Sequence, residues 1–173
     1  MIYIIPKIWA NSGTVSFWWY TKQDQTAIVD QNTSPALFQL GGYYGNSSFT
    51  LWAYHNVGNE PYLKFYIKGQ SNAGWSGSPA VKGSGTGWYH KNAWQFIAVA
   101  WRQGKYFDVY VDDSLILNNY GPIADPITSF SNNNLMIGYN SGGGKTNGNF
   151  DEVRAYNRAL TATEVVAIYN ATK

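Results

Sequence analysis

The sequence contains no cysteine and only two histidines, so it has no disulfide bond and no His/Cys cluster of the kind that binds zinc. Charged residues are also scarce, since Asp, Glu, Lys and Arg form 13% of the chain, about half of the usual share. The net charge is +2 and the Lys and Arg residues are scattered, which leaves no basic face for nucleic acid. No apolar run reaches the ~18 residues of a membrane-spanning helix. We therefore expect no nucleic acid partner and no membrane span.

Aromatic residues, by contrast, are plentiful. Trp, Tyr and Phe make up 17% of the 173 residues. Because so few charges cover the surface, many of these rings must face solvent or a ligand. The length suits one domain with a full core better than two domains, so we expect a single domain over residues 1–173.

Short strand-like runs alternate with turn-forming clusters along the chain. They lie near residues 2–9, 14–21, 36–41, 48–55, 61–68, 94–102, 105–112, 134–139 and 149–156. In several runs apolar and polar residues alternate, which is typical of a strand with one face on a core and one in water. Asp112-Asp113-Ser114 lies where a hairpin turn is expected. A series of short strands without an internal helix predicts an all-β, antiparallel two-sheet β-sandwich.

One helix signal follows the last strand. Thr161 and Glu164 have the spacing of a capping box. An apolar face follows at helical spacing: Val165, Val166, Ile168 and Tyr169. We therefore expect one short C-terminal helix.

Residues 150–160 read Phe-Asp-Glu-Val-Arg-Ala-Tyr-Asn-Arg-Ala-Leu, and this segment resembles the last strand of laminin-G-like, concanavalin A-like domains. Further blocks resemble the family's strands in the family's order: 14–19, 94–101, 106–113 and 135–138. The resemblance covers nearly the whole chain. It implies a jelly-roll sandwich and a single laminin-G-like domain, and it leaves the ligand open because function is carried by loops on the scaffold.

The longest irregular segment, residues 69–92, carries four candidate binding residues. They are Trp75, Trp88, Tyr89 and His90. A flat indole or phenol ring can cover the apolar C–H face of a sugar while its polar tip bonds elsewhere. Loops this long in a compact domain are usually functional or disordered. The alternative is that Trp75 and Trp88 fold back over the sandwich core as lids.

Two shorter loops add further candidates. Tyr43 and Tyr44 stand among glycines at the end of a strand, where ordinary turn packing is the alternative. Tyr139 and Asn140 open a glycine-rich loop, and the resemblance implies that a loop in this region forms the binding edge of lectin-like relatives. The tryptophans inside strands are interpreted as residues that pack in the core or on a face of a sheet: Trp18, Trp52, Trp94 and Trp101.

Catalysis is not expected. Glucanases with this fold carry their carboxylates on one strand as Glu-x-Asp-x-x-Glu, and the sequence has no such motif. The acidic neighbours Asp112-Asp113 and Asp151-Glu152 are adjacent, and adjacent strand residues point to opposite faces. Glycoside hydrolysis needs two carboxylates that face each other across the bond.

Calcium is the metal to consider, because it takes six to eight oxygen ligands. The resemblance implies a calcium ligand at Asp151, and Asp24 and Asp30 form a second acidic loop. The alternative for Asp151 is a structural hydrogen bond that pins the last strand to the corner before the helix.

Two functions fit these observations. The first is a non-catalytic carbohydrate-binding or adhesion module that engages saccharide through its aromatic loops. The second is a structural or interaction domain of a virion (decoration or tail-associated) or of a cell-surface assembly. Relatives usually have one more leading strand, so we expect an open sheet edge through which the chain could form an oligomer. Either function places the chain outside the cell, at the cell surface or at a virion surface.

Overall fold

The computed structural model describes residues 2–4, 10–22, 36–41, 48–54, 62–68, 80–81, 92–122, 127–130, 134–138, 146 and 148–173. In these residues the chain forms strands β1 (Ile2–Ile4), β2 (Gly13–Thr21), β3 (Ala36–Leu40), β4 (Ser48–Tyr54), β5 (Tyr62–Lys68), β6 (Ala80–Val81), β7 (Trp94–Arg102), β8 (Tyr106–Val111), β9 (Ser114–Tyr120), β10 (Asn134–Ile137) and β11 (Gly148–Tyr156), and helix α1 (Ala162–Thr172). Among these residues, no helix combines the length and the apolar character that a membrane span needs.

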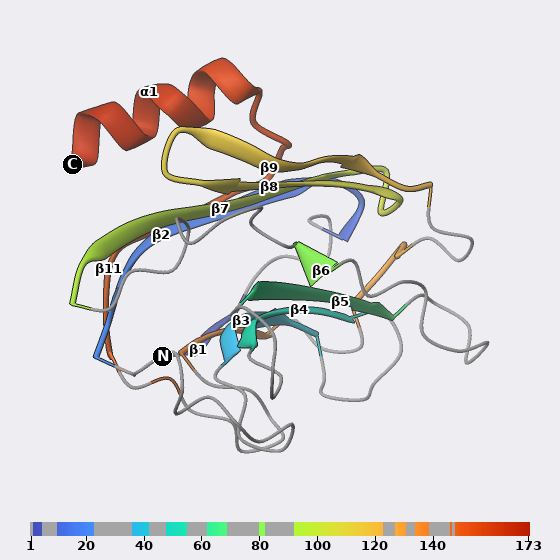
Figure 1. Cartoon of the computed structure of the whole chain (residues 1–173). Coiled ribbons are helices and arrows are strands. Elements are labelled where there is room, and N and C mark those ends of the chain that lie inside the picture. The colour runs from blue at the N-terminus through green and yellow to red at the C-terminus, as the bar shows by residue number, and fades with distance from the viewer. Residues whose placement is uncertain are drawn as a thin grey trace.

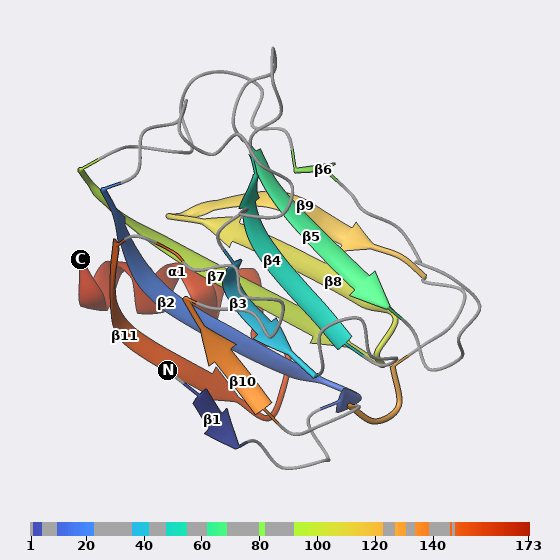
Figure 2. The same cartoon turned by 90° about the horizontal axis from the view of Figure 1, so that it is seen from below.

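The strands form two stacked antiparallel sheets (Figure 1). One sheet has the order β1-β10-β3-β4-β5-β6, and the other has the order β11-β2-β7-β8-β9. Figure 2 shows the six-stranded sheet in front of the five-stranded sheet, with α1 behind both. The predicted antiparallel two-sheet sandwich with one C-terminal helix is therefore confirmed.

The main core lies between the sheets and is built from large rings. Phe17 and Trp19 of β2, Phe38 of β3 and Trp101 of β7 are all fully buried there. Alternate residues of β2 point to the other side, as the strand period of two requires. That outer face carries a second, smaller cluster with Trp18 in it.

Helix α1 covers part of this outer face. Val165 is buried against the small cluster, and Ile168 and Tyr169 pack beside it. The capping box is confirmed: the Glu164 N–H donates to Thr161 Oγ1 at 3.3 Å, and the Thr161 N–H donates to Glu164 Oε2 at 2.9 Å. The helix therefore begins where the sequence predicted.

The corner before the helix is held by Thr14 of β2. Its hydroxyl donates to the Arg158 carbonyl at 2.9 Å and accepts from the Leu160 N–H at 2.8 Å. The sequence interpretation offered Asp151 for this task, and that alternative is wrong. Asp151 instead bonds inside its own strand.

Two strands were not predicted. Strand β6 has only two residues, and β9 follows the expected turn at Asp112-Asp113. Strand β9 is an end strand of its sheet, and Asn118 and Asn119 are residue types that strands disfavour. Its register against β8 shifts twice, so the alternating pattern of a regular strand is absent.

Candidate functional site

The loop candidates lie outside the residues that the structure describes. These are Trp75, Trp88, Tyr89, His90, Tyr43, Tyr44, Tyr139 and Asn140, together with the acidic pair Asp24 and Asp30. Their roles therefore stay predictions. The described residues contain a different site, on the outer face of the five-stranded sheet.

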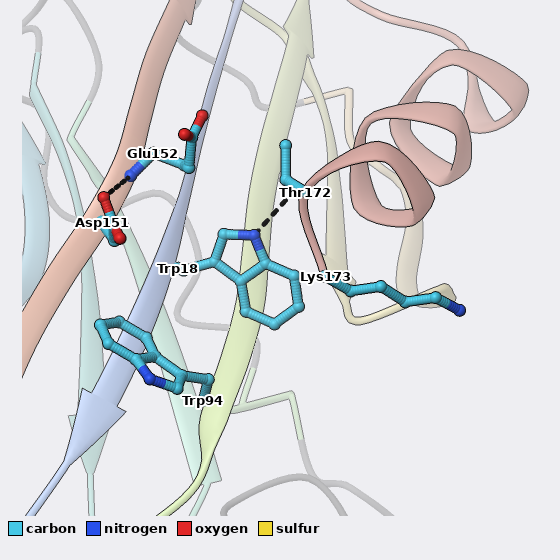
Figure 3. Close-up of a pocket in the computed structure, with 6 residues that line it drawn as sticks. All are labelled: Trp18, Trp94, Asp151, Glu152, Thr172 and Lys173. Atoms are coloured by element: carbon cyan, nitrogen blue, oxygen red, sulfur yellow. Dashed lines mark hydrogen bonds between the residues drawn. The ribbon is translucent and has the colours of Figure 1, made fainter.

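This site is a hollow of about 330 Å³, which we call the outer hollow. Its lining residues are Trp18, Trp94, Asp151, Glu152, Thr172 and Lys173 (Figure 3). They come from β2, β7, β11 and the end of α1. Segments far apart in the sequence thus meet at one place beside the helix.

Strand register explains why these side chains meet. Asp151 of β11 pairs with Trp18 of β2, which pairs with Phe96 of β7. One step along the same face, Tyr20 pairs with Trp94. Residues directly opposite each other in a sheet share a face, so two adjacent rows of side chains build the floor of the hollow.

Trp18 is the fixed part of the floor, with 8% of its surface exposed. Its Nε1 donates to Thr172 Oγ1 at 2.8 Å, and its ring stacks on Tyr169 with centroids 5.6 Å apart. Phe96 meets the same indole edge to face at 5.6 Å. The Thr172 hydroxyl donates in turn to the Ile168 carbonyl at 2.9 Å. These contacts hold the Trp18 ring in one orientation.

Trp94 is the open part of the floor. It is 44% exposed, and its ring touches Tyr20 at a centroid distance of 5.5 Å. The sequence interpretation treated Trp94 as a packing residue, like Trp18 and Trp101. Trp18 and Trp101 are buried, as core packing predicts. Trp94 packs on the face of the sheet against Tyr20 while much of its surface stays exposed, and the side chain of Trp52 lies outside the description. Trp94 is the first residue of β7, and Figure 3 places it away from the helix.

A β-bulge in β11 brings both acidic residues to the rim of the hollow. The register shifts between Asp151 and Arg154, and Glu152 has φ 50. Asp151 Oδ1 accepts the Glu152 N–H at 2.8 Å and so stabilises this conformation. A bulge interrupts the alternation of side chains. The expectation that Asp151 and Glu152 face opposite sides is therefore wrong.

The charges around the hollow are unevenly placed. Glu152 forms an ion pair with Arg154 at 2.5 Å, and this hydrogen bond raises the pKa of the Arg154 guanidinium. The Lys173 ammonium lies 5.2 Å from the centre of the Tyr169 ring, and Figure 3 shows it pointing away from the carboxylates. The rim is therefore acidic on the side of β11.

This arrangement suits binding better than hydrolysis. Both carboxylates come from neighbouring positions of one strand, so they lie on one side of the hollow and do not face each other across a bond. Among the described residues, no group of three or more His, Cys, Asp or Glu residues could hold a metal ion. What remains is an exposed indole beside hydrogen-bond acceptors, a combination that can hold a polyhydroxylated ring.

Residues 6–166 match the family model of the concanavalin A-like lectin/glucanases superfamily, and the chain belongs to this family. The predicted laminin-G-like resemblance is thereby confirmed. No curated protein matches the sequence.

Solved structures with similar folds come from larger proteins. Domain 4 of AbnA, a GH43 extracellular arabinanase from Geobacillus stearothermophilus solved with arabinotriose, is 17% identical with a TM-score of 0.62; the match covers 96% of this chain and 71% of that one. The botulinum neurotoxin serotype D binding domain is 12% identical with a TM-score of 0.67, covering 99% and 40%. Trypanosoma rangeli sialidase is 12% identical with a TM-score of 0.59, covering 92% and 22%. The chain thus spans less than half of the toxin domain and of the sialidase, and at these identities the likeness shows a shared fold.

Proposed function

We propose that this chain is a non-catalytic carbohydrate-binding module that acts outside the cell or at its surface. The observation that carries the proposal is Trp94, a 44% exposed indole beside a hollow with acidic acceptors on its rim. The indole covers the apolar face of a sugar ring. Asp151 accepts hydrogen bonds from the ring hydroxyls, since each carboxylate oxygen can accept more than one.

Two of the similar structures support this choice by their own contents. The arabinanase domain was solved with arabinotriose, and the toxin match is named a binding domain. Both belong to larger proteins, and each match covers most of this chain. The same comparisons favour an extracellular location, because the arabinanase is described as extracellular.

The loop aromatics remain part of the proposal as a second contact surface. Trp75 and Trp88, with Tyr89 and His90, would extend the binding surface beyond the outer hollow. Tyr43, Tyr44, Tyr139 and Asn140 are proposed as further contacts in the same way. Calcium at Asp24 or Asp30, or at Asp151 in place of a direct bond to the sugar, is proposed in the same way.

A glycan array followed by calorimetry on its best neutral hit tests the function. We expect the wild type to bind, and Trp94→Ala to bind at least roughly tenfold more weakly, a loss of about 1.4 kcal/mol. Its melting temperature should change little, because the ring is half exposed. Leu115→Ala is the matched control, since Leu115 is 39% exposed on β9, outside the lining of the hollow.

The outcomes separate the hypotheses. An array without any hit for the wild type would refute the carbohydrate function. Full binding by Trp94→Ala would remove the outer hollow as the site, and Trp75→Ala and Trp88→Ala would then be compared in the same assay.

A structural role in a virion or cell-surface assembly is the second candidate. Leu115, exposed on an end strand of the five-stranded sheet, is the observation that favours it. An exposed apolar side chain at a sheet edge can contact another chain. This role predicts a stable oligomer that ignores glycans.

A further inference from the structure

The proposed function does not say whether the bound saccharide is neutral or charged. The charged residues that line the outer hollow bear on this question. We infer that the hollow selects neutral saccharides and rejects sugars that carry a carboxylate, sulfate or phosphate group. This inference rests on the proposed function, because it names the class of saccharide that the same site accepts.

Asp151 carries the first part of the argument. Register places it opposite Trp18, so its carboxylate stands on the face where a sugar would stack on the neighbouring Trp94. Its side chain is exposed, and Oδ1 accepts one bond from the Glu152 N–H. No Lys, Arg or His in the described part of the chain lies within ion-pair distance of it. No cation of the described residues therefore offsets the Asp151 carboxylate at the rim.

Glu152 adds a second, weaker contribution. Its carboxylate is paired with Arg154, which offsets much of its charge. Both partners are solvent-exposed, with side-chain exposures of 44% and 39%, so the pair is weak and screened by salt. Glu152 lines the hollow whereas Arg154 does not. An approaching anion would thus meet the carboxylate before it met the guanidinium.

Lys173 is the one cation among the lining residues described, and it is directed away from the place where a sugar would stack. Its Nζ lies over the Tyr169 ring at 5.2 Å, an attractive cation–π distance. In Figure 3 the side chain extends away from Asp151 and Trp94. Among the described lining residues, an acidic sugar stacked on Trp94 would therefore meet two carboxylates, and the one ammonium group is directed away from it.

The hydrogen-bonding capacity of the carboxylates also favours neutral saccharides. A carboxylate only accepts hydrogen bonds, so it pairs with sugar hydroxyls that donate. An ionised acid group on the sugar also only accepts, so it would leave both partners unsatisfied and bring like charges together. Desolvating such a pair is costly. A neutral sugar ring brings neither the unsatisfied acceptors nor the repulsion between like charges.

Matched ligand pairs test the inference on the full chain. We would measure affinities for xylotriose and its glucuronic acid-substituted form, and for lactose and its sialylated and sulfated forms. In each pair that binds, the neutral sugar should have an affinity at least about tenfold higher than that of the acidic sugar in low salt. Because the screening length is only about 3 Å at 1 M salt, the ratio should shrink at high salt.

Variants identify the groups responsible. Asp151→Asn keeps the shape and removes the charge, so it should reduce the neutral-to-acidic ratio, and the double variant Asp151→Asn/Glu152→Gln should bring it close to one. Glu164→Gln is the control, because it removes the same charge at the other end of α1 and should leave the ratio unchanged.

Different results contradict the inference and the proposed function. If an acidic sugar binds the wild type as tightly as its neutral partner, or if the double variant keeps the full ratio, the inference is wrong while the carbohydrate function stands. If neither the array nor any of these sugars binds the wild type, the proposed function itself fails.

Discussion

One backbone angle at Glu152 shapes the outer hollow. A positive φ is uncommon for a residue with a Cβ, and here the neighbouring Asp151 carboxylate stabilises it through the Glu152 N–H. The Asp-Glu-Val-Arg sequence thus has a structural role, because it forms the β-bulge and contains the Glu152–Arg154 ion pair across it. The same residues that carry the family resemblance also present two carboxylates to one side.

At the residue scale, Gly13 offers a test of core packing. A Cβ at this position would lie 2.2 Å from the Trp101 ring, which is fully buried. Because the indole has no room to move, we expect Gly13→Ala to lower the free energy of unfolding by about 1–3 kcal/mol. Urea unfolding measures this loss. Equal stability of Gly13→Ala and of the exposed control Leu115→Ala would contradict the packing described here.

At the scale of elements, α1 depends on the ionisation of Glu164. Two hydrogen bonds from Arg158, and one from the Thr161 N–H, lower the pKa of Glu164 from 4.5 to about 2. A carboxylate with a lower pKa in the folded state stabilises the fold above its unfolded pKa and loses that contribution as the pH falls. The contribution should therefore be complete above about pH 5 and disappear towards pH 2.

Thermal melts followed by circular dichroism between pH 7 and pH 2 measure this effect. We expect the melting temperature of the wild type to fall more steeply below pH 4.5 than that of Glu164→Gln. Other carboxylates titrate in both proteins, so the difference between the two curves isolates Glu164. Parallel curves would show that the Arg158–Glu164 pair adds nothing to stability.

The sequence predicted the regular elements well and the exceptions poorly. Runs that alternate or are continuously apolar, such as β7, and the capping box of α1 have strong local patterns, and these predictions are confirmed. Strand β9 and the β11 bulge escaped prediction because their geometry depends on partner strands. The exposure of Trp94 escaped for a similar reason: Trp18 and Trp94 both lie in strands, and only the position of α1 decides which ring is covered.

At the scale of the molecule, the sheet edges bear on assembly. Strand β9 shifts register twice, β11 carries the bulge, and β1 and β6 have three and two residues. Short or irregular end strands are poor templates for pairing with another chain. The end strands that the structure describes therefore favour a monomer.

Light scattering coupled to size exclusion tests this expectation. We expect the mass of one 19.3 kDa chain in solution, also after saturation with a neutral oligosaccharide. A stable oligomer that falls apart on Leu115→Lys and binds no glycan would instead support the assembly role and place its contact on β9.

The bond between Trp18 and Thr172 joins residues 154 positions apart. A ribosome releases β2 long before it makes α1, and chains begin to fold from the N-terminus during synthesis. Most strands of the two layers are thus made well before Thr172 and Lys173, which complete the outer hollow. In a growing polypeptide, the outer hollow would therefore be completed later than most of the strands that support it.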